Sequence, residues 1–598
     1  MCGIVGYIGD KVVDKELVDI LKNLEYRGYD SAGVAVYDNG EIVSTKAEGK
    51  IANLEAILNG SKTASMGIAH TRWATHGKPT TVNAHPHMSD NKKWAVVHNG
   101  IIENFGELKK EIVSKTGVKF VSETDTEVIA QMLQYLDNED IVDTLINTCN
   151  RLEGSFALGV INKTDSDTLY LAKRKSPLYV AKCKKEVFVA SDPICFAGKA
   201  TEYYMLEDDE FCMVNVGNIV FYDKNKCVID KKSVKLNSFE KNFGKQDYPH
   251  FMLKEIEEVP SVLNRIVATY TDSRAFEKID GELLKSINKI ILVGCGTAYH
   301  AGLMGANMIE KFARVDARTF VASEFRYSDP IIDDKTLAIF VSQSGETADT
   351  LSAHDLAKSK GAKTIALTNV LYSALAKKAD FVLPVCAGPE IAVASTKAYT
   401  AQISILYMFA KYLSNVIKNT SYDYMVDIKK LADTLEIPSA DSLESLANDL
   451  VSLDNAFFIG RGVDYVSSEE ASLKLKEITY ISTQAYPSGE LKHGFLALVE
   501  SGTMLFVIAT QKDLLDKTLN GAHEAYARGA RIVLATQFDV PEEKLQDVYF
   551  NIKLPKFEDD LMPIVSIGAF QMLSYLTSVK KGYNPDQPRN LAKSVTVE

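Results

Sequence analysis

The chain has 598 residues, of which 46% are hydrophobic and 24% charged, a composition typical of a soluble globular protein with about two to four domains. Its net charge of −12 argues against nucleic acid as the main partner, because phosphate backbones are bound by clustered lysine and arginine. The eight cysteines form no CxxC pair and no array with zinc spacing, which indicates reduced thiols rather than a metal site. We find neither a signal peptide nor an apolar run of membrane-spanning length, and we expect a cytoplasmic protein.

Residues 1–239 have the pattern of a mixed α+β domain. Short β-branched runs occur at 33–37, 94–97 and 156–160, and many of them end in turn residues such as Asn99-Gly100. Helical stretches at 14–24 and 126–136 lie between such runs. The polar stretch 240–249 then interrupts the pattern, and we expect a linker there.

From residue 250 onward the strands become continuous apolar runs separated by helices, as in parallel sheets covered on both faces. This half also repeats itself. The strand 289–293 ends in Gly294-Cys295-Gly296, and the strand 455–459 ends in Gly460-Arg461-Gly462. A later strand follows Gly294 and another follows Gly460 after nearly the same number of residues. We therefore predict two tandem α/β domains of one fold, at 250–430 and 431–585. A tail at 586–598 follows them.

Cys2 is the first chemical signal. A small residue at this position allows the initiator methionine to be removed, which would leave Cys2 with a free α-amine. Such an amine has a pKa of about 7.7–8.0 and could accept the proton of the thiol, so that one residue supplies nucleophile and base. Taken alone, a cysteine at position 2 is more often an accident.

Three further segments fit the groups of glutamine. Arg72 offers a guanidinium fork for a carboxylate, and Asp125 could bind an ammonium group, although capping of the helix that follows is its ordinary role. Asn99 and Gly100 offer a side-chain amide and an unhindered backbone N–H, the two donors that an oxyanion hole needs.

The segments 2–6, 26–33, 72–77 and 99–100 together resemble the glutaminase domain of class II glutamine amidotransferases. The resemblance implies an N-terminal nucleophile hydrolase fold with four αββα layers. It also implies that Cys2 attacks the amide while Asn99 and Gly100 hold the oxyanion. The glutamine-binding residues that it implies are Arg72, Thr75, His76 and Asp125. The channel gate that it implies is Trp73.

A cluster of hydroxyls follows the apolar strand 337–341. The run Ser342-Gln343-Ser344-Gly345-Glu346-Thr347 leads directly into a helix, where free N–H groups and the helix dipole favour a phosphomonoester. Simple helix capping is the alternative. The second repeat, at 508–511, lacks this cluster, so we expect one phosphate site per chain. The glycines at 294 and 296 lack the third glycine of a dinucleotide loop, and we reject nicotinamide binding.

Four other residues in this half could carry chemistry. Lys474 and Glu477 are three residues apart and therefore share one face of a predicted helix, although a surface ion pair is the ordinary interpretation. His493 lies in a predicted loop, where histidines are usually structural. Lys593 lies five residues from the end of the chain, where it is either idle or folded into a site.

The repeats resemble sugar isomerase domains, and the order of motifs along the whole chain resembles the family of glutamine-dependent fructose-6-phosphate aminotransferases. The resemblance implies that His493 opens the sugar ring, Lys593 forms a Schiff base and Glu477 moves a proton between carbons beside Lys474. The phosphate ligands that it implies are Thr297, Ser342, Gln343, Ser344, Thr347 and Ser395. No metal or other cofactor is needed, ammonia would pass through an internal channel, and a homodimer is expected.

Two residues depart from the family pattern, Ala298 near the phosphate and Phe495 after the His493 loop. Three alternatives stay open. A deglycase-like relative would keep the isomerase motifs, and a sugar-phosphate sensor would need none of the reactive residues. A phosphoribosyl-type amidotransferase would lack the isomerase repeat.

Overall fold

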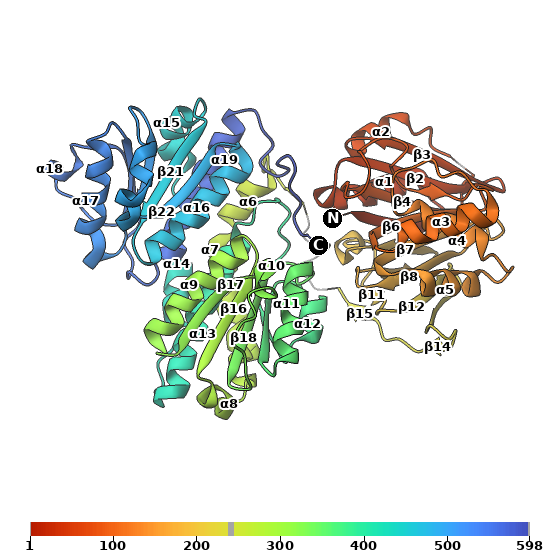
Figure 1. Ribbon diagram of the computed structural model, residues 1–598, viewed down its shortest axis with the longest axis horizontal. Helices are drawn as coiled ribbons and strands as arrows, with labels where there is room; N and C mark the ends of the chain where they lie inside the picture. The colour runs from red at the N-terminus through yellow and green to blue at the C-terminus, as the bar shows by residue number, and fades with distance from the viewer. Residues whose placement is uncertain (1, 62, 237–243, 596–598) are drawn as a thin grey trace. The chain divides into compact units, whose positions relative to one another are not determined.

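The computed structural model describes residues 2–61, 63–236 and 244–595, and it separates into two compact units (Figure 1). The first unit comprises Met1–Gly244 together with Ala592–Glu598, and the second comprises Lys245–Leu591. Each unit is considered by itself below.

The first unit stacks two sheets between layers of helices. In its described part, one sheet has eight strands in the order β15-β11-β9-β10-β1-β4-β2-β3, and the other has seven in the order β14-β13-β12-β8-β7-β6-β5. The bounds of the first sheet's strands, in that order, are Val234–Lys235, Glu202–Met205, Tyr179–Cys183, Glu186–Ala190, Gly3–Ile8, Met66–Arg72, Ser31–Asp38 and Glu41–Glu48. Those of the second are Val228–Ile229, Ile219–Tyr222, Glu210–Val214, Leu169–Arg174, Gly154–Asn162, Trp94–Ile102 and His87–Met88.

Alternation along the strands explains the layers. In β1, Ile4 and Ile8 join a core with Val97 and Ala157 of the other sheet, so the two sheets pack face to face. The opposite face of β6 and β7 packs on helices through a second core that includes Val96 and Leu158. The helices of the unit are α1 (Val13–Leu21), α2 (Ile51–Ile57), α3 (Phe105–Thr116), α4 (Glu127–Tyr135) and α5 (Ile141–Arg151). The four-layer αββα prediction is confirmed.

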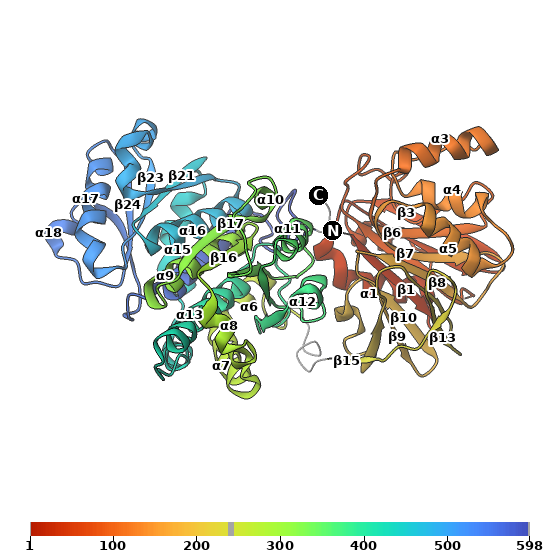
Figure 2. The same ribbon diagram turned by 60° about the horizontal axis from the view of Figure 1, so that its bottom comes forward.

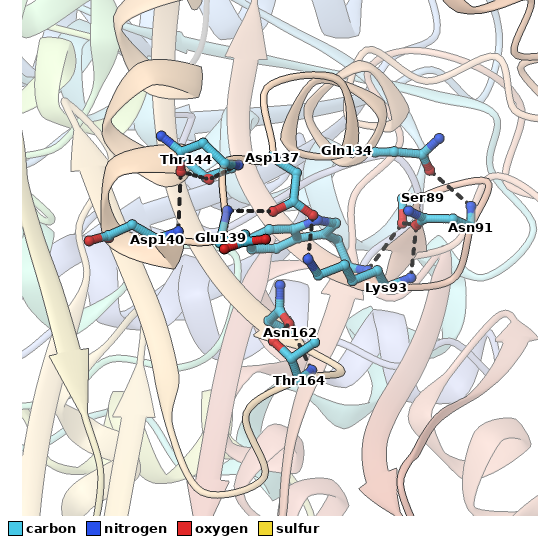
Figure 3. Close-up of polar contacts among 12 residues, drawn as sticks. Ser89, Asn91, Lys93, Gln134, Asp137, Glu139, Asp140, Thr144, Asn162 and Thr164 are labelled. Atoms are coloured by element: carbon cyan, nitrogen blue, oxygen red, sulfur yellow. Dashed lines mark hydrogen bonds and ion pairs between the residues drawn. The ribbon is translucent and has the colours of Figure 1, made fainter.

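A polar network fastens the beginning of β6 to the end of α4 (Figure 3). Lys93 Nζ lies 2.5 Å from a carboxylate oxygen of Asp137, and the backbone N–H of Asn91 donates to Gln134 Oε1 at 2.9 Å. The Ser89 hydroxyl donates to Asn91 Oδ1 at 2.7 Å and so closes the turn before the strand. These contacts fix the start of the strand that carries Asn99 nearer its other end.

The second unit contains two parallel sheets of the same topology (Figure 2). In its described residues each sheet has five strands, in the orders β17-β16-β18-β19-β20 and β22-β21-β23-β24-β25. The bounds of the first sheet's strands are Asp316–Val321, Lys289–Gly294, Thr336–Ser342, Lys363–Thr368 and Phe381–Pro384. Those of the second are Ser482–Pro487, Asn455–Gly460, Met504–Ile508, Arg531–Thr536 and Val548–Lys553. The predicted repeat of parallel sheets is confirmed.

Long central helices join the two repeats into one hydrophobic core. Met304 of α9, Phe409 of α13, Leu475 of α16 and Phe570 of α19 all belong to it. The longer helices of the unit are α7 (Val259–Ser273), α9 (Thr297–Phe312), α11 (Ala348–Ser359), α13 (Lys397–Lys418), α15 (Ala440–Leu450), α16 (Val463–Thr479), α17 (Leu515–Tyr526) and α19 (Met562–Lys580). The shorter ones are α6 (Phe251–Glu257), α8 (Gly281–Ser286), α10 (Ala322–Phe325), α12 (Ala374–Lys378), α14 (Val426–Thr434) and α18 (Glu542–Leu545).

The helix α19 is long and apolar enough to cross a membrane by composition, which differs from the expectation that the chain contains no such run. Its most apolar window is 89% buried inside the unit, however, which is the position of a core helix. Ser574, Thr577 and Gln571 interrupt the apolar residues and lie within the buried part.

Candidate functional site

Cys2 lies directly before β1 and is half-buried beside the end of β4. β1 and β4 pair antiparallel with Gly3 opposite Thr71, which brings Trp73 to the cysteine. The Trp73 N–H donates to Cys2 Sγ at 3.3 Å, and Sγ lies 3.6 Å from the Trp73 carbonyl oxygen. Burial raises the pKa of the Cys2 thiol, while the Trp73 N–H and the Arg72 guanidinium act in the opposite direction. A base that accepts the thiol proton is therefore needed to form the thiolate at neutral pH.

Asn99 contacts Cys2 from the second sheet. Its side-chain Nδ2 donates to the Cys2 carbonyl oxygen at 3.1 Å, and its Oδ1 lies 3.1 Å from His70 Nε2. Gly100 follows with a φ of +136°, and a Cβ at this position would lie 2.0 Å from the Ser155 carbonyl oxygen. Only glycine fits there, and the structure brings the predicted Asn99-Gly100 pair to the predicted nucleophile.

Two of the predicted glutamine ligands, Arg72 and Asp125, lie close enough to Cys2 to interact with it electrostatically. Arg72 is 3% exposed, and its guanidinium donates to backbone carbonyls of the following loop, at 3.2 Å to Gly77 and 3.3 Å to Lys78. Its positive charge also interacts with Cys2 and Asp125. The guanidinium thus organises the loop 76–78 in this structure.

Asp125 does not have the capping role that its position before a helix suggested. Its Oδ2 accepts the backbone N–H of Ile102 at 2.8 Å, at the end of β6, and the N-cap residue of α4 is Thr126. The carboxylate is buried and joins the helix to the strand that carries Asn99.

The remaining predicted residues of this unit lie in the loop after β4. Thr75 Oγ1 lies 3.4 Å from His76 Nδ1, and the His76 ring meets Phe105 edge-on at 5.7 Å. The Trp73 ring contacts Tyr29 edge-on at 5.8 Å.

In the second unit, the predicted phosphate cradle is a tight turn between β18 and α11. Ser342 Oγ accepts the Gly345 N–H at 2.9 Å and lies 3.4 Å from Thr347 Oγ1. Ser344 Oγ accepts the Glu346 N–H at 3.2 Å. Gly345 has a φ of +66°, and a Cβ there would lie 2.0 Å from a serine oxygen. Thr347 is the N-cap of α11 but makes no side-chain capping bond, so its hydroxyl stands at the positive end of the helix.

Two other predicted phosphate ligands have different partners. The Ser395 hydroxyl donates to Glu390 Oε2 at 2.9 Å, and Glu390 is buried. The Gln343 carbonyl oxygen accepts the Asn369 N–H at 3.2 Å, which joins the turn to the end of β19.

A buried charge network connects α16 with α9 of the first repeat. The Lys474 side chain is 0% exposed, and its ammonium lies 2.6 Å from Glu477 Oε2, 2.9 Å from Thr297 Oγ1 and 3.5 Å from Glu470 Oε1. The Thr297 hydroxyl donates to Glu470 Oε1 at 3.0 Å, and His300 Nδ1 lies 2.7 Å from Glu470 Oε2. Burial lowers the pKa of Lys474, but Glu477 and Glu470 outweigh burial and raise it. Lys474 is therefore a charged, buried lysine rather than a member of a surface ion pair.

The last two residues predicted for the sugar chemistry are His493 and Lys593. His493 is exposed at the end of a short 3₁₀ helix, Ser488–His493, and Phe495 packs its ring on Phe457 at 4.8 Å in the core. Lys593 belongs to the C-terminal segment that groups with the first unit. Its predicted role in sugar chemistry rests on sequence.

The second repeat holds a carboxyl group near the place that corresponds to the phosphate cradle. A Cβ on Gly294 would meet the backbone of Ala298, and a Cβ on Gly460 would meet the backbone of Asp464. Asp464 of the second repeat therefore corresponds to Ala298 of the first. Asp464 is 1% exposed and accepts the Thr510 N–H at 2.8 Å as well as the Thr510 hydroxyl. Burial raises the pKa of Asp464 to about 7.

Comparisons with known proteins agree with the division into an N-terminal domain and two α/β repeats. A model of the SIS domain matches residues 283–412 and 449–580, and a model of a glutamine amidotransferase domain matches 70–197. A protein of Caldanaerobacter subterraneus, named glutamine–fructose-6-phosphate aminotransferase [isomerizing], is 44% identical over 611 residues with all of both chains covered. A Clostridium tetani protein with the same name is 42% identical over the full lengths. The solved C-terminal domain of glucosamine-fructose-6-phosphate aminotransferase from Francisella tularensis is 35% identical with a TM-score of 0.54, and covers 58% of this chain and 100% of that one.

Proposed function

Because this chain belongs to the family of isomerizing glutamine–fructose-6-phosphate aminotransferases, we propose specific residues for each of its two half-reactions. The enzyme converts glutamine and fructose 6-phosphate into glutamate and glucosamine 6-phosphate, and so supplies amino-sugar synthesis. The full-length match to relatives of this name favours it over a deglycase or a sensor, and the SIS domains oppose a phosphoribosyl acceptor.

In the first half-reaction, Cys2 Sγ attacks the side-chain amide carbon of glutamine, and the thiol proton passes to the α-amine of the mature first residue. The C–N bond then breaks, ammonia leaves with that proton, and water hydrolyses the γ-glutamyl thioester to glutamate. Asn99 and Gly100 hold the oxyanion of each tetrahedral intermediate. The 3.1 Å contact between Asn99 Nδ2 and the Cys2 carbonyl oxygen carries this assignment, because it brings a predicted donor to the predicted nucleophile.

Glutamine itself would be oriented by charged groups near Cys2. Arg72 would bind the α-carboxylate, exchanging part of its bonding to the loop carbonyls, and Asp125 would bind the α-ammonium. Thr75 and His76 would complete the site from the loop after β4.

In the second half-reaction, the hydroxyls of Ser342, Ser344 and Thr347 would hold the phosphate at the N-terminus of α11. The further ligands of this group would be Thr297, Gln343 and Ser395. His493 would open the ring and Lys593 would form a Schiff base with the ketose.

Glu477 would then move the proton from C1 to C2 of the sugar. Its carboxylate is held by the buried Lys474 ammonium at 2.6 Å, which supports a fixed position for the proton carrier. Ammonia released into bulk water would be protonated, so we also propose an internal passage with Trp73 as its gate. A homodimer and a cytoplasmic location complete the proposal.

The test is incubation with glutamine and fructose 6-phosphate, followed by separate assays of glutamate and hexosamine phosphate. Cys2→Ala should abolish glutamate release, whereas Cys183→Ala, which alters another half-buried cysteine of the same unit, should leave it unchanged. Lys593→Ala should retain glutamate release and lose amino-sugar formation. Undiminished glutamate release by the Cys2→Ala variant would refute the assigned nucleophile.

A further inference from the structure

His70 is a fully buried histidine of β4 that the proposed chemistry leaves without a role. Its Nε2 lies 3.0 Å from the backbone carbonyl oxygen of His98 and 3.1 Å from the side-chain Oδ1 of Asn99. A backbone carbonyl only accepts hydrogen bonds, so Nε2 must carry the proton. The His98 carbonyl oxygen therefore fixes the tautomer of His70 as the one protonated at Nε2.

This proton determines which way the Asn99 amide faces. The atom of Asn99 that faces His70 Nε2–H has to be the oxygen, because the amide nitrogen would set two N–H groups against each other. The NH2 group then faces the Cys2 carbonyl oxygen, an acceptor, at 3.1 Å. The two neighbours of Asn99 thus require the same orientation.

The surroundings keep His70 neutral and in place. Its ring stacks on that of His85 with 4.1 Å between centroids and 13° between planes. Its Nδ1 is buried and has no hydrogen-bond partner among the described residues. Burial lowers the pKa of His70 to about 3, so the ring carries a single proton at any working pH.

His85 is itself held at two points. Its Nδ1 accepts the His98 N–H at 3.3 Å. Its carbonyl oxygen lies where a Cβ on Gly33 would be only 2.1 Å away, so the backbone of this segment packs directly on β2. The stacking partner of His70 is thus part of a rigid layer.

We propose that His70 is a positioning residue for amide cleavage, which holds the Asn99 NH2 group toward the reacting centre through its Nε2–H. This inference rests on the roles proposed above for Cys2 and Asn99. Removing an oxyanion donor outright typically lowers kcat by about 10²–10³. Loss of the group that orients the donor should cost part of that, about 10- to 100-fold.

The experiment compares His70→Phe with His70→Gln in the full-length enzyme. Phenylalanine keeps the ring but removes the donor, whereas the glutamine side chain can place an N–H near the former Nε2. We expect His70→Phe to lower kcat for glutamine hydrolysis about 10- to 100-fold with KM for glutamine within about twofold, and His70→Gln to retain most of the activity. Thermal melting of each variant reports folding.

A second readout separates positioning from general damage. Iodoacetamide alkylates Cys2 at a methylene carbon without forming an oxyanion, so its rate with His70→Phe should match that of the wild type. An equal fall in alkylation and hydrolysis would overturn the inference, because His70 would then shape the nucleophile or the fold. Unchanged hydrolysis in His70→Phe would overturn it as well.

A double-mutant cycle distinguishes this inference from the proposed function. In an Asn99→Ala background, His70→Phe should change kcat by less than about twofold, because the group that it orients is gone. Additive effects would overturn the inference while leaving the role of Asn99 intact. Wild-type kcat in Asn99→Ala alone would instead show that the proposed oxyanion donor is wrong.

Discussion

Replacing Asp464 by asparagine should stabilise the second unit, and by more at alkaline than at acidic pH. Burial raises the pKa of this carboxyl group to about 7, with the negative charge of Asp559 acting in the same direction. Asparagine has the same shape and can still accept the Thr510 N–H that the carboxyl group accepts at 2.8 Å. The substitution removes the ionisation, and it also replaces the oxygen that accepts the Thr510 hydroxyl by an NH2 group, a loss that does not depend on pH.

The sign follows from the two protonation equilibria. Below about pH 4 the carboxyl group is protonated in both states, and it adds no pH-dependent term. Between about pH 4 and 7 the unfolded chain loses the proton while the folded chain keeps it, so stability falls as pH rises. Above pH 7 both states are ionised and the cost stays constant. Three pKa units at about 1.4 kcal/mol each give a full cost of about 4 kcal/mol.

About 3 kcal/mol of this cost develops between pH 5 and pH 8. The assay is differential scanning calorimetry across this range, following the transition that fructose 6-phosphate shifts upward. We expect the Tm difference between Asp464→Asn and the wild type to be about 3–6 °C larger at pH 8 than at pH 5. Asp513→Asn alters an exposed carboxylate nearby and serves as the matched control. A pH-independent difference for Asp464→Asn, or one that becomes unfavourable at pH 8, would refute the reasoning.

Two further substitutions test the second unit. Lys474→Met should abolish amino-sugar formation and lower the Tm, because Glu477 and the fully buried Glu470 both lose their ammonium partner, and breaking a buried ion pair costs about 3–5 kcal/mol. An unchanged Tm in calorimetry would contradict the buried network. Gly345→Ala should raise KM for fructose 6-phosphate at least about tenfold, since the added Cβ would lie 2.0 Å from Ser373 Oγ and would distort the turn proposed to bind the phosphate. Gly281→Ala, where a Cβ meets open space, should leave KM unchanged, and equal values for the two variants would count against the turn as the phosphate site.

The fold class could be predicted from the sequence because it depends on local patterns. Short alternating strands indicated the first unit, and continuous apolar runs at repeated offsets indicated the two parallel sheets. Cys2 and Asn99 could also be paired beforehand, because their motifs point to complementary steps of one reaction. The structure adds that the two residues are in contact.

Residues that act through tertiary contacts were missed. Glu470 has the appearance of an exposed glutamate on α16, and only the packing of α9 against this helix buries it beside His300. Its one sequence signal was its spacing of four residues from Lys474. His70 was hidden in the same way, because its contact with Asn99 arises where strands from two stacked sheets approach each other.

The carboxyl group of Asp464 has a consequence for how the duplicated halves of the second unit divide their work. It already occupies the N–H and hydroxyl donors of Thr510, so that end of the later sheet is complete without any small molecule. The turn 342–347 of the first repeat instead places the hydroxyls of Ser342 and Thr347 at the start of α11, 3.4 Å apart. On the function proposed above, the first repeat would bind the sugar phosphate, while the second would hold α16 and its Glu477 carboxylate in a fixed position.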